Sequence, residues 1–130
     1  MIDSATAVSE FAPLPRLEAL IETHVVTLLN DQKKHAAALT ELRCLSRHER
    51  ELVTDLRDRY EQITEEAIRG AQASAQLRAD ISPKLMRLGL LGMLNWTVFW
   101  YRPDGELTPS DVGKAFASMF VNGAAAPVGR

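Results

Sequence analysis

The 130-residue sequence predicts an all-α fold, a bundle of five helices, and three observations predict it. Apolar residues recur at the i, i+3, i+4, i+7 spacing of an amphipathic helix over most of the chain. No segment alternates apolar and polar residues for long enough to predict a strand. Most of the six prolines and seven glycines fall between the helical patterns, where such residues mark ends and turns. We expect one domain over residues 13–123, with a leader over residues 1–12 and a flexible tail over residues 124–130.

The composition limits the class of protein. Hydrophobic residues make up 46% of the chain and charged residues 25%, which is ordinary for a globular domain. The net charge of −2 provides no positive field that would attract nucleic acid or anionic lipid. The only cysteine, Cys44, cannot form a disulfide within the chain. The apolar run over residues 88–101 is shorter than a membrane span of about 20 residues. We therefore expect a soluble, cytoplasmic protein that does not bind membranes.

The first two helices follow from apolar spacing and end signals. Pro13 and Pro15 suit the opening turn of the first helix. Its inward face consists of Leu17, Leu20, Ile21, His24, Val25, Leu28 and Leu29. Asn30 or Asp31 then caps a shorter helix over residues 32–45. The inward residues of this second helix are Ala36, Leu39 and Leu42.

The third helix begins at a capping box, in which Ser46 and Glu49 are three residues apart. One stripe of this helix consists of Leu52, Leu56, Tyr60, Ile63, Ala67 and Leu77. The opposite face is acidic, and we interpret it as solvated. On that face Glu65 and Arg69 form an i, i+4 ion pair.

Two proline-led starts and one turn define the last two helices. Ser82 before Pro83 begins the fourth helix, and Thr108 before Pro109 begins the fifth. Between them, residues 102–105 read Arg-Pro-Asp-Gly, a turn sequence. A short turn predicts that these two helices are antiparallel or steeply crossed neighbours.

The fourth helix is apolar on every side. Leu85, Leu88, Gly92, Trp96 and Phe99 fall on one side, and Leu90, Leu94, Val98 and Tyr101 on the other. Such a helix is buried all round, and a small bundle has too few neighbours to cover it. We therefore expect a homodimer, a four-helix bundle formed by the last two helices of each copy. The expected interface residues are Gly89, Gly92, Val112, Phe116, Met119 and Phe120. The alternative is a monomer in which this helix is fully internal.

The segment Leu91–Gly123, "LGMLNWTVFWYRPDGELTPSDVGKAFASMFVNG", resembles the last two helices of the TetR/AcrR family of bacterial regulators, especially members that sense acyl-CoA or steroid-derived CoA thioesters. The resemblance covers residues 13–123. It implies a domain that binds a hydrophobic or acyl-CoA-like effector and dimerises. Such regulators begin with a helix-turn-helix domain, and this sequence contains no basic recognition helix, so the resemblance implies DNA binding only through a domain outside it. Two alternatives are a headless protein that forms mixed dimers with full-length regulators and a purely structural helical dimer.

In the family, the effector lies between helices that correspond to the first, third and fourth described above. The candidate ligand-binding residues are His24, Arg59, Tyr60, Met93, Asn95, Trp96, Phe99 and Trp100. A structural role is open for each type: His24 as a hydrogen-bonded core residue, Arg59 in an ion pair with Asp55, Asn95 bonded to a backbone carbonyl, and the aromatic residues in packing.

Enzymatic motifs are lacking in the sequence. Its three histidines show no HExxH pattern and no paired spacing for a metal. Cys44 has Arg43 beside it and His48 four residues later, but no acid to orient a base. We expect a protein that is not an enzyme and that uses no metal or cofactor.

Overall fold

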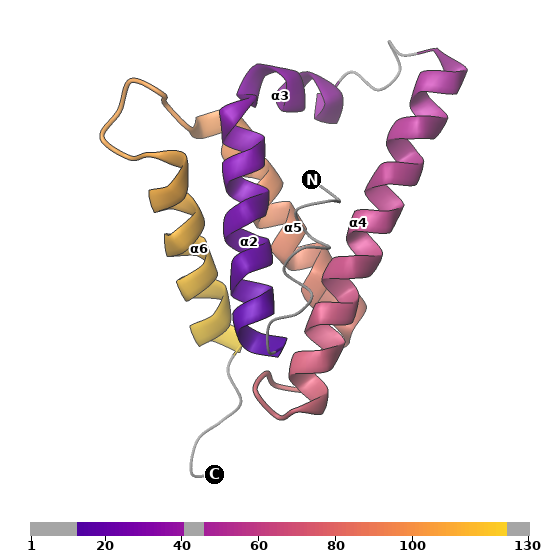
Figure 1. Ribbon diagram of the computed structural model, residues 1–130, viewed down its shortest axis with the longest axis vertical. Helices are drawn as coiled ribbons and strands as arrows, with labels where there is room; N and C mark the ends of the chain where they lie inside the picture. Colours follow the sequence, from indigo (N-terminus) through magenta and orange to yellow (C-terminus); the bar gives the residue numbers. More distant parts are fainter. Residues whose placement is uncertain (1–12, 41–45, 125–130) are drawn as a thin grey trace.

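The structure, a computed structural model, describes residues 13–40 and 46–124, and in these ranges it contains helices and no strand (Figure 1). The prediction of an all-α fold is therefore confirmed. The helices are α2 (Pro13–Asn30), α3 (Gln32–Thr40), α4 (Arg47–Ala73), α5 (Pro83–Trp100) and α6 (Pro109–Ala124). The predicted leader, most of the tail, Leu42 and Cys44 lie outside the described residues.

Helix α2 is the centre of the bundle. It packs against α6 on one side and against α4 and α5 on the other, as Figure 1 shows. Its predicted inward face is buried, with Leu17, Leu20, Ile21 and Val25 almost completely inaccessible to solvent. Burial of a leucine or valine side chain stabilises a fold by roughly 1.5–3 kcal/mol, so this face accounts for much of the core.

The position of α6 differs from the prediction. Helix α6 packs chiefly against α2. Its contact with α5, its neighbour in sequence, includes the rings of Trp100 and Phe116, whose centroids are 6.1 Å apart. Gly113 explains the close approach of α6 to α2. A β-carbon at this position would lie 3.1 Å from the Cα and the carbonyl oxygen of Glu22.

Helix α4 has two different halves. The predicted capping box is present, since the Ser46 hydroxyl accepts from the Glu49 N–H and the Glu49 carboxylate accepts from the Ser46 N–H. The first half is largely exposed, and Leu52, predicted to face inward, is 51% exposed. From Tyr60 onward the helix contributes buried side chains to the core.

The end of α4 also corrects a prediction. The helix stops at Ala73, and Ala75 adopts a left-handed conformation with φ of 61°. Leu77, which was assigned to the stripe of this helix, lies beyond its end and is nevertheless buried. The side-chain amide of Gln72 fixes the following turn by donating to the carbonyl oxygens of Arg78 and Ile81.

Both ends of α5 are fixed by side chains. The Ser82 hydroxyl accepts from the backbone N–H of Leu85 at 3.1 Å, as predicted for an N-cap before Pro83. At the other end, the amide of Gln32 on α3 donates to the carbonyl oxygens of Val98 and Tyr101 at 2.9 and 2.8 Å. Because the last carbonyls of a helix lack partners within it, Gln32 positions α5 relative to α3.

The connection to α6 is the predicted turn. The Gly105 N–H donates to the carbonyl oxygen of Arg102 at 2.9 Å. Thr108 and Asp111 then cap α6 reciprocally, each side chain accepting from the backbone N–H of the other.

None of the helices in the described ranges combines the length and the apolar character needed to cross a lipid bilayer.

Candidate functional site

Three polar side chains from three helices meet in the core. His24 on α2 and Tyr60 on α4 stack with ring centroids 4.9 Å apart and an angle of 21° between the planes. The Nε2 of His24 lies 2.8 Å from the Oδ1 of Asn95 on α5. His24 and Tyr60 are buried, and Asn95 is partly buried. We call these three residues the polar triad.

Burial determines the ionisation of the triad. It lowers the pKa of His24 from 6.5 to about 4, against a smaller opposing effect of the hydrogen bond to Asn95. It also raises the pKa of the Tyr60 hydroxyl above its usual value. Both side chains are therefore neutral at pH 7. The Nδ1 of His24 is buried and has no hydrogen-bonding partner among the residues that the structure describes.

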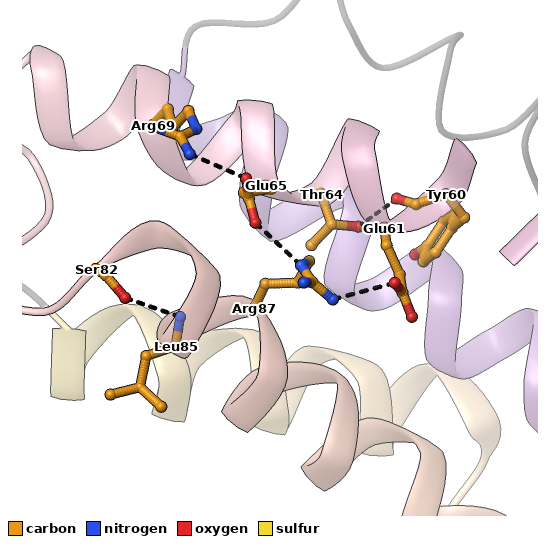
Figure 2. Close-up of polar contacts among 8 residues, drawn as sticks. All are labelled: Tyr60, Glu61, Thr64, Glu65, Arg69, Ser82, Leu85 and Arg87. Atoms are coloured by element: carbon orange, nitrogen blue, oxygen red, sulfur yellow. Dashed lines mark hydrogen bonds and ion pairs between the residues drawn. The ribbon is translucent and has the colours of Figure 1, made fainter. Parts of the chain in front are cut away.

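A second polar cluster joins α4 to α5. The guanidinium of Arg87 lies between Glu61 and Glu65, with nitrogen–oxygen distances of 3.1 Å to each, and Glu65 also pairs with Arg69 at 3.0 Å (Figure 2). The bonds to Arg69 and Arg87 lower the pKa of the Glu65 carboxyl. The predicted Glu65–Arg69 pair is thus confirmed. The acidic face of α4 is not simply solvated, because Glu61 and Glu65 on this face pair with Arg87 of α5, whose side chain is only 13% exposed.

Beside this cluster is a surface groove of about 320 Å³, lined by Asp58, Glu61, Gln62, Glu65 and Arg87. No three His, Cys, Asp or Glu side chains within the described ranges are arranged to hold a metal ion. Arg87 is one of the few polar residues on the otherwise apolar helix α5, and its pairing with α4 was not predicted. An arginine at such a position, with two glutamates four residues apart on another helix, is a signal that could have predicted this cluster.

One side of α5 is exposed although it is apolar. Trp96 is 63% exposed and Leu85 61%, and the same side carries four further exposed residues. We call this surface the outer flank; it consists of Leu85, Leu88, Gly89, Gly92, Trp96 and Phe99. The opposite side, with Leu90, Leu94 and Val98, is buried in the core. A single chain therefore covers only one of the two apolar sides of α5.

Helix α6 carries one further exposed apolar side chain among the expected interface residues. Met119 is 60% exposed, whereas Phe116 and Phe120 are half-buried and pack against the core. Val112 differs from the expectation that it contacts a second copy: it is 3% exposed and belongs to the core of its own chain. The close packing of α6 on α2 accounts for this difference.

The eight candidate ligand-binding residues fall into three groups. His24, Tyr60 and Asn95 form the polar triad, and the partner of Asn95 is the imidazole of His24. Met93 is half-buried against the core, and Arg59 is exposed with no ion pair to Asp55 in the described part of the chain. The structure places the remaining three away from the triad: Trp96 and Phe99 on the outer flank and Trp100 in contact with Phe116.

Comparison with known proteins identifies the architecture. The model of the family described as "Tetracyclin repressor-like, C-terminal domain" matches residues 10–124. The chain belongs to this family. The family consists of C-terminal domains, and the five described helices correspond to the fold of such domains in TetR-family regulators of known structure.

Individual relatives agree with the assignment. The chain is 30% identical over 111 residues to the HTH-type transcriptional repressor KstR2 of Rhodococcus jostii (strain RHA1), a match that covers 85% of this chain and 50% of the repressor. The structure of the ketosteroid transcriptional regulator KstR2 of Mycobacterium tuberculosis superposes with a TM-score of 0.87 at 19% identity, over 97% of this chain and 66% of that chain. AibR, in a crystal structure with isovaleryl coenzyme A and operator DNA, gives a TM-score of 0.71 at 24% identity, over 94% and 64% of the two chains.

Family membership defines the class of protein. The relatives of this chain named above are transcriptional regulators and not enzymes. This agrees with the prediction from the sequence that the protein is not an enzyme. The chain spans about half the length of the curated relative that it matches. The helices that carry the polar triad, α2, α4 and α5, are the first, third and fourth helices of the sequence analysis.

Proposed function

We propose that this chain is the effector-binding and homodimerising domain of a cytoplasmic TetR-like transcriptional regulator, and that its effector is a hydrophobic molecule or a CoA thioester. Binding to DNA would need a helix-turn-helix domain in addition to the helices described above. The polar triad is the observation that carries the effector site. The Nδ1 of its buried His24 has no hydrogen-bonding partner among the residues that the structure describes, and most of the side chains in the core around it are apolar.

Two lines support the class of effector. AibR, which shares the fold, binds isovaleryl coenzyme A, and the resemblance in the last two helices extends to regulators of this kind. The core around α2 presents leucine, isoleucine and methionine side chains, and apolar linings with a few polar groups are typical of small-molecule sites.

Calorimetric titration with octanoyl-CoA, against free coenzyme A as a control, tests the effector assignment. We expect binding of the thioester that is saturable and stronger than that of coenzyme A, because only the thioester has an acyl chain to bury. The variant Tyr60→Ala, which removes one wall of the triad, should weaken binding. Equal affinities for the thioester and for coenzyme A would contradict an acyl-binding core.

The outer flank supports the homodimer. Its residues form a continuous apolar strip along one side of α5, and exposed strips of this kind mark protein interfaces. A stable contact buries about 800 Å² on each partner. Gly89 and Gly92 leave room, since a β-carbon at either position would meet nothing within 4 Å in the single chain. Together with Met119 and Phe116, the flank provides a self-complementary surface for a second copy.

Light scattering at micromolar concentration tests this second part. The wild-type protein should be a dimer, and Trp96→Glu should be a folded monomer because it places a charge within the flank. Leu52→Glu is the control: Leu52 is also a large apolar residue and is 51% exposed, but it lies on the first half of α4. A wild-type monomer, or a dimer that survives Trp96→Glu, would contradict the proposed interface.

A further inference from the structure

We propose that the effector carries a hydrogen-bond donor, a hydroxyl or an amide N–H, which it presents to the Nδ1 of His24. This inference rests on the proposed function, because it concerns the same site. It narrows the effector from any hydrophobic molecule to one with a donor group within its apolar part.

The argument begins with the fixed orientation of the imidazole. The ring of His24 stacks on Tyr60 from α4, and its Nε2 bonds to Asn95 from α5. On α2 itself, the buried Leu20 and Leu28 lie one helical turn before and one helical turn after His24. Because contacts from three helices hold the ring, the direction in which Nδ1 points is fixed as well.

The hydrogen bond to Asn95 determines which nitrogen carries the proton. The atom at 2.8 Å from Nε2 is the amide oxygen Oδ1, which can only accept, so Nε2 is the donor. A neutral imidazole has one N–H, and the burial that lowers the pKa of His24 keeps it neutral at pH 7. Nδ1 is therefore an unprotonated acceptor.

This acceptor is buried and without a donor in the described part of the chain. A buried polar atom without a partner is unfavourable, and a ligand that supplies the partner recovers the lost hydrogen bond. Only a donor can do so. A ketone, ester or thioester oxygen would place its lone pairs against the lone pair of Nδ1, and a methylene would leave the nitrogen unpaired. Sites built around a specific hydrogen bond discriminate strongly against analogues that lack the matching group.

Nuclear magnetic resonance on protein labelled with ¹⁵N-histidine tests the inference with two probes of nearly equal shape, cyclohexanol and cyclohexanone. The resonances of His24 are distinguished from those of His35 and His48 by the spectrum of His24→Phe. In the free protein we expect a protonated Nε2 and an unprotonated Nδ1. Cyclohexanol should shift the Nδ1 resonance and bind roughly 5- to 150-fold more tightly than cyclohexanone. In His24→Phe this preference should disappear.

The outcomes separate the inference from the proposed function. Three results would each overturn the inference: a protonated Nδ1 in the free protein, a ketone that binds as well as the alcohol, and an Nδ1 resonance that neither probe moves. The last result includes the case in which a buried water alone satisfies the nitrogen. If octanoyl-CoA binds in the same preparation, the proposed function stands even though the inference about the hydrogen-bond donor fails. If octanoyl-CoA and both fragments fail to bind, the proposed function fails too. The comparison of the two probes uses the wild-type protein, so it does not depend on the folding of the variant.

Discussion

Acidification should destabilise this domain, and one contribution that can be isolated comes from the imidazole of His24. Its pKa is about 4 in the folded chain, whereas it is about 6.5 in an unfolded chain. Between these values the unfolded state binds a proton that the folded state does not, so the free energy of unfolding decreases as the pH falls. The contribution of His24 is fully present above pH 6.5. The loss amounts to about 1.4 kcal/mol at pH 5.5 and to about 3 kcal/mol at pH 4.

Urea unfolding of the wild type and of His24→Phe at a series of pH values measures this contribution. The variant keeps an aromatic ring against Tyr60 but cannot titrate. Several carboxyl groups also have lowered pKa values and destabilise the fold at acid pH, but they are common to both proteins and cancel in the difference; they are Glu49, Glu65, Asp80 and Asp111. The free energy of unfolding of the wild type should therefore fall by about 3 kcal/mol relative to the variant between pH 7 and pH 4.

A difference that stays constant over this range would refute the reasoning, because it would show that His24 takes up its proton as easily in the folded chain as in the unfolded one. His35 provides the control. Burial also lowers its pKa, but His35 is only partly buried on the short helix α3. The variant His35→Gln should therefore keep most of the pH dependence of the wild type.

Three further predictions concern the joints between helices. Gly113→Ala should lower the free energy of unfolding in urea by roughly 1–3 kcal/mol, because its β-carbon would press on the backbone of Glu22, whereas Gly123→Ala, with open space around it, should not. Arg87→Met should lower the melting temperature measured at low salt and weaken its dependence on salt, since it removes the ion pairs between α4 and α5; an unchanged salt dependence would contradict this. Ser82→Ala should destabilise α5 by about 1 kcal/mol in urea through the loss of its N-cap, which is drawn in Figure 2.

The helices could be predicted from the sequence because their end signals are local. The capping box at Ser46, the Ser82–Pro83 start and the turn at residues 102–105 each depend on residues within a few positions of one another. The end of α4 was harder to predict. Ala75 has a left-handed backbone conformation, which is usually occupied by glycine, so no glycine in the sequence marked the end of the helix. Leu77 then appeared to continue the apolar stripe although the helix had ended.

The neighbours of each helix could not be predicted in the same way. Periodicity identifies an apolar face but not the helix that covers it, so α6 was paired with α5 when α2 is its main neighbour. The same limit explains the candidate site. His24, Tyr60 and Asn95 are far apart in sequence, and each is a separate polar group on the apolar face of a helix. Only the fold shows that Tyr60 and Asn95 both contact His24. The aromatic residues of α5 were selected with them because the sequence does not show which side of that helix faces α2.

The two-sided character of α5 has a specific structural basis in two consecutive residues. Asn95 points inward and bonds His24, whereas Trp96 lies on the outer flank, because successive side chains of a helix diverge by about 100°. We propose that the inner side of α5 closes the effector site and that its outer side contacts a second copy. Both sides of the helix must then be apolar. Both residues lie on one helix, so a ligand that shifts α5 through Asn95 would also shift the surface around Trp96. Substitutions one residue apart should therefore separate the two roles, with Asn95 variants altering the tautomer of His24 and Trp96 variants altering the dimer.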